Sequence, residues 1–337
     1  MITRNSLNLH DCWQQELAQA YTDPKLLLEA LDLDPECFAE ETAARTLFPM
    51  RVPRPFVAAM EKGNPRDPLL LQVLPAAREF DQIAGYGPDP LEEQASAVPG
   101  ILHKYRSRAL LMLKGGCAVN CRYCFRRHFP YGDNQLSGSA MEQAIDYLAS
   151  DTRLNEVILS GGDPLMAKDA HLQRLIKRLE TLPHLTRLRI HSRLPVVLPA
   201  RLTTELEQLL TSTRLKAVLV LHINHPNEIT PELKEKLLML SQSGVTLLNQ
   251  SVLLRGVNDS AEVLGRLSEA LFDAGVLPYY LHLLDKVQGA AHFDLPESRA
   301  RELMSQLLEA MPGFLVPRLV REVGGRNSKT PVDLHLA

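Results

Sequence analysis

Three cysteines lie close together near the middle of the chain, at Cys117, Cys121 and Cys124, with the spacing C-x3-C-x2-C. Thiolates are soft ligands that suit iron–sulfur clusters, zinc or Cu(I). A structural zinc site takes four protein ligands, and no fourth cysteine lies nearby. Three thiolates on a four-iron cluster leave one iron open to a small molecule. We therefore favour a catalytic iron–sulfur cluster. The alternatives are a zinc site completed by His103 or His128, or three thiols without a metal.

A second motif, Gly161-Gly162-Asp163-Pro164, follows the apolar run at 156–159. Two glycines allow a ligand to approach the backbone closely, and a carboxylate can accept hydrogen bonds from an ammonium group. A turn alone would explain the same four residues equally well. The motif therefore gains weight mainly from its position, one predicted strand and helix after the cysteines.

Alternating elements must position these motifs. Short apolar runs predict strands at 109–113, 156–159, 187–190, 217–223, 246–253 and 279–283. Amphipathic segments predict helices at 139–150, 169–181, 203–211, 231–243, 261–274 and 298–310. Such a series indicates parallel strands with right-handed crossovers, either in an open sheet or in a partial (β/α)6 barrel. In both folds the chemistry lies at the carboxyl ends of the strands, where the two motifs fall.

The first hundred residues differ from the rest, because repeated prolines interrupt short helical patterns. We expect a helical, loop-rich module at 1–100, an α/β core at 101–311 and a short C-terminal segment at 312–337. Pro24 and Pro35 suit first helical turns, where the missing N–H costs nothing.

Composition limits the classes of function. The 337 residues carry a net charge of -3, which argues against nucleic-acid binding through bulk positive charge. Five cysteines are an odd number, so a complete disulfide framework is excluded. No targeting segment or membrane span is expected. We expect a cytoplasmic protein, because clustered cysteines in a reducing compartment more often bind metals or react than cross-link.

The two motifs together resemble the signature of the radical S-adenosylmethionine (SAM) superfamily, in which SAM binds the open iron of a 4Fe-4S cluster. Further matches make the chain, over about residues 85–331, similar to the lysine 2,3-aminomutase family, which also uses pyridoxal 5′-phosphate (PLP). These matches lie at 104–108, 124–128, 191–199, 222–228, 249–259, 279–285 and 324–331. The length looks most like a short bacterial branch that makes (R)-β-lysine, which a partner ligase attaches to elongation factor P.

The resemblance implies roles for single residues. The cluster ligands would be Cys117, Cys121 and Cys124, and SAM would contact Tyr123, Gly161, Gly162, Asp163, His222 and Gln250. Lys329 would bind PLP covalently, with Arg108 and Lys104 at the phosphate. Arg126 would bind the carboxylate of the substrate, and Asp285 and Glu322 its side-chain ammonium.

Two positions depart from the family pattern. Lys104 replaces an arginine, and Glu322 replaces an aspartate with a carboxylate one methylene longer. Taken without the resemblance, Lys329 fits an exposed lysine, Arg126 an exposed basic patch with Arg127, and His222 a core histidine. Gln250 alone would be a polar residue at a strand end.

The expected substrate is free lysine, because an arginine that binds a carboxylate implies a free carboxylate. The resemblance also implies a flavodoxin- or ferredoxin-like electron donor, and a functional link to the ligase and to elongation factor P. We expect no nucleic-acid or membrane partner. The rival interpretations are the same chemistry on another amino acid, and a non-catalytic binding protein stabilised by zinc.

Overall fold

A single sheet organises the described residues of this computed structural model, which are 12–93, 99–131, 136 and 138–335. Within them the sheet has nine strands in the order of the chain. The strands are β1 (Ile101–Tyr105), β2 (Arg108–Lys114), β3 (Glu156–Gly161), β4 (Arg187–Ser192), β5 (Lys216–Leu221), β6 (Thr246–Val252), β7 (Leu277–His282), β8 (Arg318–Arg321) and β9 (Thr330–Pro331). Strands β2 to β8 are parallel, whereas β1 and β9 pair antiparallel at the two edges.

Helices connect the parallel strands: α5 (Gly138–Ser150), α6 (Asp169–Glu180), α8 (Thr204–Thr211), α9 (Pro231–Gln242), α10 (Ala261–Asp273) and α11 (Glu297–Ala310). Their first turns begin where the sequence provides caps. Thr203, Thr230 and Ser260 each accept a backbone N–H through the side-chain hydroxyl, at the starts of α8, α9 and α10. The predicted six strands and six helices are confirmed, with ends that differ by a few residues.

The fold class is confirmed as an α/β partial barrel, since the sheet runs from β1 to β9 without closing on itself in the described residues.

Three strands were not predicted. The most consequential of them is β8, which pairs parallel to β7 through Leu281 and Leu319. It draws the C-terminal segment into the sheet, so that β9 and the nearby Lys329 lie at its edge.

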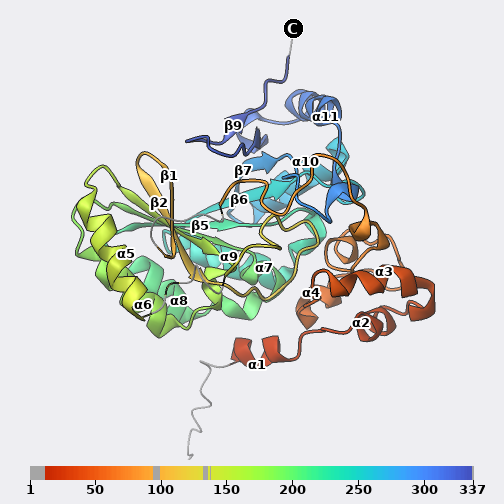
Figure 1. Cartoon of the computed structure of the whole chain (residues 1–337), viewed down its shortest axis with the longest axis horizontal. Helices are drawn as coiled ribbons and strands as arrows, with labels where there is room; N and C mark the ends of the chain where they lie inside the picture. Colours follow the sequence, from red (N-terminus) through yellow and green to blue (C-terminus); the bar gives the residue numbers. More distant parts are fainter. Residues whose placement is uncertain (1–11, 94–98, 132–135, 137, 336–337) are drawn as a thin grey trace, which may run out of the picture.

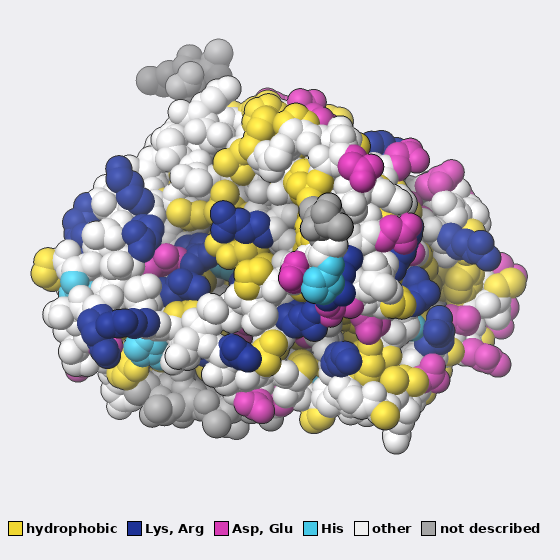
Figure 2. Space-filling view, turned by 90° about the horizontal axis from the view of Figure 1, so that it is seen from above, with side chains coloured by type: hydrophobic (Ala, Val, Ile, Leu, Met, Phe, Trp, Pro, Cys, Tyr) yellow, Lys and Arg dark blue, Asp and Glu magenta, His cyan; other side chains and the backbone are white. Residues whose placement is uncertain are grey.

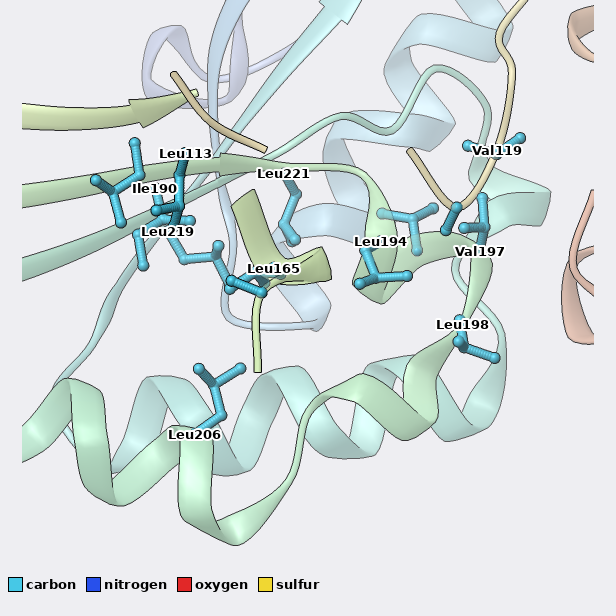
Figure 3. Close-up of a cluster of buried hydrophobic side chains, with 14 of the residues drawn as sticks. Leu113, Val119, Leu165, Ile190, Leu194, Val197, Leu198, Leu206, Leu219 and Leu221 are labelled. Atoms are coloured by element: carbon cyan, nitrogen blue, oxygen red, sulfur yellow. The ribbon is translucent and has the colours of Figure 1, made fainter. Parts of the chain in front are cut away.

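The core lies between the sheet and the helices on its outer face. Figure 3 shows Leu206 of α8 pointing toward the sheet, where Leu113, Ile190 and Leu219 gather. All four side chains are at most 1% exposed. Burying a leucine-sized side chain contributes about 1.5–3 kcal/mol, so this interface fixes the strands whose far ends carry the site.

The N-terminal residues form the short helices α1 (Cys12–Ala18), α2 (Pro24–Ala30), α3 (Ala39–Ala43) and α4 (Arg54–Ala58). Figure 1 shows α2, α3 and α4 on one side of the molecule, away from α5 and α6. Pro24 and Pro35 stand in first helical turns, as predicted. Phe56 is buried in the same apolar cluster as the barrel leucines, so these helices share its core.

Several loops link this N-terminal region to the segment that follows β2. The backbone N–H groups of Asn120 and Arg122 donate to the carbonyls of Arg51 (3.1 Å) and Gln72 (2.9 Å).

None of the helices in the described residues has the length and apolar character needed to cross a bilayer. On the face in Figure 2, Lys and Arg side chains are interspersed with Asp and Glu and form no continuous basic stripe.

Candidate functional site

One cavity at the carboxyl ends of the parallel strands is lined by every site residue that the sequence singled out. They are Lys104, Arg108, Cys117, Cys121, Tyr123, Cys124, Arg126, Gly161, Gly162, Asp163, His222, Gln250, Asp285, Glu322 and Lys329. These residues lie up to 225 positions apart in the chain, and the parallel sheet brings them together. Cys37 is exposed and lies outside the cavity, and the side chain of Cys12 falls outside the described residues.

The cysteine loop directly follows β2, and its three thiols are free. Burial, followed by the neighbouring Cys121, raises the pKa of Cys124 to about 11, and burial raises that of Cys117 well above its ordinary value. Both thiols are therefore protonated at neutral pH until a metal takes the thiolates and releases the protons. In the described part of the chain, no three His, Cys, Asp or Glu side chains are arranged to hold one metal ion. The three thiols line one cavity, and cysteine thiolates are the ligands that iron–sulfur clusters take, so this donor set fits a cluster.

Neither histidine proposed for a zinc site points into the cavity. His103 Nδ1 lies 2.6 Å from the Tyr147 hydroxyl on α5. His128 is exposed and does not line the cavity. The zinc alternative therefore lacks a fourth ligand in the described residues.

Gly161, the last residue of β3, and Gly162 lie against β2 and the cysteine loop, whereas the sequence suggested an approach to a ligand. Gly162 N–H donates to the carbonyl of Lys114 (2.8 Å), and Asp163 N–H donates to that of Gly116 (3.0 Å). A Cβ at Gly162 would lie 2.6 Å from the Gly116 oxygen, and Gly161 has a φ of +116°. Only glycine fits this approach without displacing the backbone of the cysteine loop.

Asp163 is buried, and its carboxylate already accepts four hydrogen bonds. One oxygen accepts from Leu165 N–H (3.0 Å) and the Ser192 hydroxyl (2.7 Å). The other accepts from the N–H groups of Arg193 (2.9 Å) and Leu194 (2.8 Å). A carboxylate offers about four lone-pair sites. Groups of the chain itself thus surround this carboxylate, and Asp163 joins the ends of β3 and β4; its contact with an ammonium group stays a prediction.

Tyr123 and Cys121 meet a buried arginine that the sequence did not single out. Arg193 Nη1 lies 2.9 Å from Cys121 Sγ and also contacts the Tyr123 hydroxyl. Its Nη2 donates to Gln72 Oε1 (2.7 Å) and to Glu228 Oε2 (3.1 Å). A fixed cation therefore lies beside one proposed cluster ligand. The residue was visible in the sequence after β4, but nothing in its spacing indicated this contact.

The ends of β5 and β6 carry His222 and Gln250. Gln250 Nε2 lies 3.0 Å from His222 Nε2. Burial, and then the cations Arg193 and Lys329, lowers the pKa of His222 to about 3, so the ring is neutral and accepts from the amide. In the described residues, Gln250 Oε1, His191 Nε2 and His282 Nε2 are buried without a hydrogen-bond partner. Buried polar atoms are normally paired, so these cavity-lining groups fit a bound polar ligand.

Charged side chains of the C-terminal segment also line the cavity. Lys329 Nζ pairs with Glu322, and it lies 5.7 Å from the centre of the Tyr280 ring. Arg108 stacks over the Tyr105 ring at 3.9 Å. The N–H groups of the Arg108 guanidinium have no hydrogen-bond partner among the described residues, which leaves them available for a phosphate.

Asp285 follows β7 and faces the same group of charges. Burial in the pocket, and then the carboxylate of Glu322, raises the pKa of Asp285 to about 7. Two acidic side chains and the lysine thus share one region, where a second ammonium would be stabilised.

Arg126 lies in the cavity with its guanidinium held on two sides. Nε donates to Glu93 (2.8 Å), and Nη1 donates to the Ser160 hydroxyl (3.1 Å) and the Gly161 carbonyl (3.3 Å). Lys104 Nζ lies 2.8 Å from the other oxygen of Glu93. Glu93 was missed by the sequence reasoning, because two adjacent glutamates before the first strand have no distinguishing spacing.

Named relatives align with this chain over its whole length. A model of the Radical SAM superfamily matches residues 112–265, from β2 into α10. The chain is 55% identical to the L-lysine 2,3-aminomutase of Escherichia coli (strain K12), over 100% of this chain and 98% of that protein. It is 56% identical to the protein of the same name from Haemophilus influenzae, over 94% of each chain. It is 39% identical to that of Clostridium subterminale, over 82% of this chain and 67% of that protein.

Proposed function

The chain belongs to the lysine 2,3-aminomutase family of radical SAM enzymes, and we propose that it converts free (S)-α-lysine to (R)-β-lysine for the modification of elongation factor P. It is an isomerase that uses a 4Fe-4S cluster, SAM and PLP. Family membership excludes the non-catalytic zinc protein as a rival. The product stereochemistry, the link to elongation factor P and the residue roles below are proposals.

The observation that carries the choice of substrate is the distribution of charge along the cavity. Arg126 lines the cavity, and its planar guanidinium suits a carboxylate. Asp285 and Glu322 lie near Lys329 and suit the ε-ammonium of lysine. A glutamate side chain would meet like charges there, and an uncharged side chain would leave the carboxylates unpaired. Free lysine presents both complementary groups.

Three sets of residues would hold the cofactors. The cluster set is Cys117, Cys121 and Cys124; the SAM set is Tyr123, Gly161, Gly162, Asp163, His222 and Gln250; the PLP set is Lys329, Arg108 and Lys104. When bound, the cluster and SAM supply the radical that takes hydrogen from lysine, and PLP carries the amino group that moves. Within the SAM set we give Asp163 a positioning part, because its carboxylate holds the ends of two strands together.

The protein's own contribution is to orient these groups and to exclude water. Arg108 would offer the N–H groups of its guanidinium to the phosphate, and Lys104, which lines the same cavity, would add a positive charge. Glu322 holds the Lys329 ammonium beside Tyr280. Neutral His222 fixes the amide of Gln250, which leaves the buried amide oxygen unpaired and able to accept a hydrogen bond from a ligand.

The short branch of the family is supported by identity, which is 55% to the Escherichia coli relative and 39% to the Clostridium subterminale relative. The chain spans 98% of the Escherichia coli relative but 67% of the Clostridium subterminale relative. Recognition of a carboxylate by Arg126 favours free lysine over a lysine within elongation factor P, which lacks that group. A partner ligase would then transfer the product, and a flavodoxin- or ferredoxin-like protein would supply the electron. We place the enzyme in the cytoplasm, where its thiol ligands stay reduced.

We also propose that the chain is organised in three structural units. They are the helical module at 1–100, the α/β core at 101–311 and the segment at 312–337 that carries Lys329. Strand β8 couples the last unit to the core sheet.

The test starts with anaerobically purified protein. We expect iron, sulfide and PLP in the protein, and borohydride to fix the PLP onto Lys329. With lysine, SAM and reductant, chiral chromatography should show (R)-β-lysine, and added ligase should transfer it to elongation factor P. Zinc in place of iron, a label on another lysine, or faster turnover of arginine or glutamate would overturn the proposal.

A further inference from the structure

Glu93 lies between two cations that the proposed function assigns to different ligands. Its side chain is 6% exposed. One carboxylate oxygen is 2.8 Å from Lys104 Nζ, and the other is 2.8 Å from Arg126 Nε. The side chains of Lys104 and Arg126 are themselves 21% and 9% exposed. A single buried carboxylate thus bridges the two positive groups.

The contacts of Arg126 fix the orientation of its guanidinium. Glu93 fixes the Nε edge of the guanidinium, and the end of β3 fixes Nη1 through Ser160 and Gly161. Nη2 has no hydrogen-bond partner among the described residues. A planar fork held at two of its three nitrogens presents the third in one direction, which lowers the entropy lost when a carboxylate binds.

The charges explain why a carboxylate is needed at this point. Burial opposes ionisation of Glu93, but Arg126 and then Lys104 more than offset it and bring the pKa of Glu93 down to about 2. Glu93 is therefore ionised throughout the working pH range. Without it, two cations would remain in a poorly solvated wall with no compensating charge.

We propose that Glu93 is a positioning residue that aims Arg126 at the substrate carboxylate and holds Lys104 beside it. The inference rests on the proposed function, because it takes Arg126 as the group that binds the substrate carboxylate. Glu93 acts through Arg126 and does not touch the substrate, so on protein already loaded with PLP its effect on binding should appear with ligands that carry a carboxylate.

The test compares lysine with cadaverine, which keeps both amino groups of lysine and lacks the carboxylate. Binding is measured on PLP-loaded protein without SAM, from the change in the absorption band of PLP. We expect Glu93→Gln to raise the Kd of lysine by about 10-fold or more, and that of cadaverine by about 2-fold at most. Glu93→Asp, which keeps the charge, should recover part of the lysine affinity. Exposed Glu269 on α10 provides the control variant Glu269→Gln, which should bind both ligands like the wild type.

Each outcome is decisive. Equal losses for lysine and cadaverine would mean that Glu93 only maintains the fold, and unfolding temperatures would show the same. No loss for either ligand would mean that Arg126 is held without Glu93. A wild-type protein that binds lysine no better than cadaverine would contradict the role of Arg126 itself, and with it the basis of the inference.

Discussion

Gly162→Ala is the sharpest test of how the cavity is built, because this glycine lies against the backbone of the cysteine loop. A Cβ at Gly162 would lie 2.6 Å from the Gly116 oxygen, 2.8 Å from the Gly115 carbonyl carbon and 2.9 Å from the Gly115 oxygen. All three contacts are with backbone atoms, so no side chain can rotate away. The turn after β3 and the loop after β2 would have to separate.

The size of the separation follows from these distances. Ordinary van der Waals contact begins at 3.4 Å, which is 0.8 Å beyond the closest contact. A shift of that size would stretch the Gly162–Lys114 and Asp163–Gly116 hydrogen bonds, now 2.8 and 3.0 Å long. Overpacking of this kind costs about 1–3 kcal/mol of stability. Because the displaced loop leads into Cys117, we expect activity to fall by about 100-fold, the usual cost of misplacing reacting groups by about 1 Å.

The assay measures iron per chain after anaerobic reconstitution, the rate of SAM cleavage and the unfolding temperature. Gly313→Ala is the control, since a Cβ there meets nothing within 4 Å and φ is ordinary. We expect the control to match the wild type in all three measurements. If Gly162→Ala also keeps wild-type iron content and SAM cleavage, the close approach has no functional part and the reasoning is refuted.

Three further predictions follow from the site. Burial and Glu322 raise the pKa of Asp285 to about 7, and only the ionised carboxylate attracts an ammonium, so lysine should bind more tightly as pH rises from about 6 to 8. Asp285→Asn should flatten this profile of Kd against pH; a flat wild-type profile would contradict the assignment. Arg193→Gln removes the cation beside Cys121 and should make the reduction potential of the cluster more negative, as followed by electron paramagnetic resonance. Arg193→Lys keeps the charge and should change the potential less. Equal potentials in the wild type and both variants would exclude this influence. Alanine at any of the three clustered cysteines should abolish iron binding, whereas Cys37→Ala, at an exposed thiol, should leave the iron content unchanged. If one of the three variants retains its iron, the replaced cysteine is not a ligand of the cluster.

Local patterns explain why the sheet could be predicted from the chain alone. The apolar run at β3 is buried along its whole length, and β4 alternates between buried and partly exposed residues. Such periods depend on neighbours within one element. Strand β8 escaped prediction because its four residues, Arg-Leu-Val-Arg, carry too short a pattern. Its strand conformation comes from pairing with β7, which is a contact between distant segments.

Asp163 shows where motif reasoning reached its limit. The residue type indicated a carboxylate able to accept hydrogen bonds, and that property holds. The donors, however, are backbone and side-chain groups of the chain itself. Which donors reach a carboxylate depends on how the ends of β3 and β4 meet, and no spacing within one motif specifies that.

By itself, the sequence determined the chemistry of the groups: three thiols at cluster spacing, glycines for a close approach, and a series of strands and helices whose carboxyl ends must share one edge. These follow from residue type and short-range periodicity. Only the tertiary structure decided which charges meet. Glu93 joins Lys104 to Arg126, and β8 brings Glu322 and Lys329 to Asp285. Hydrogen bonds act over a few ångströms and Coulombic energies fall with distance, whereas these partners are separated along the chain, so folding alone sets their distances.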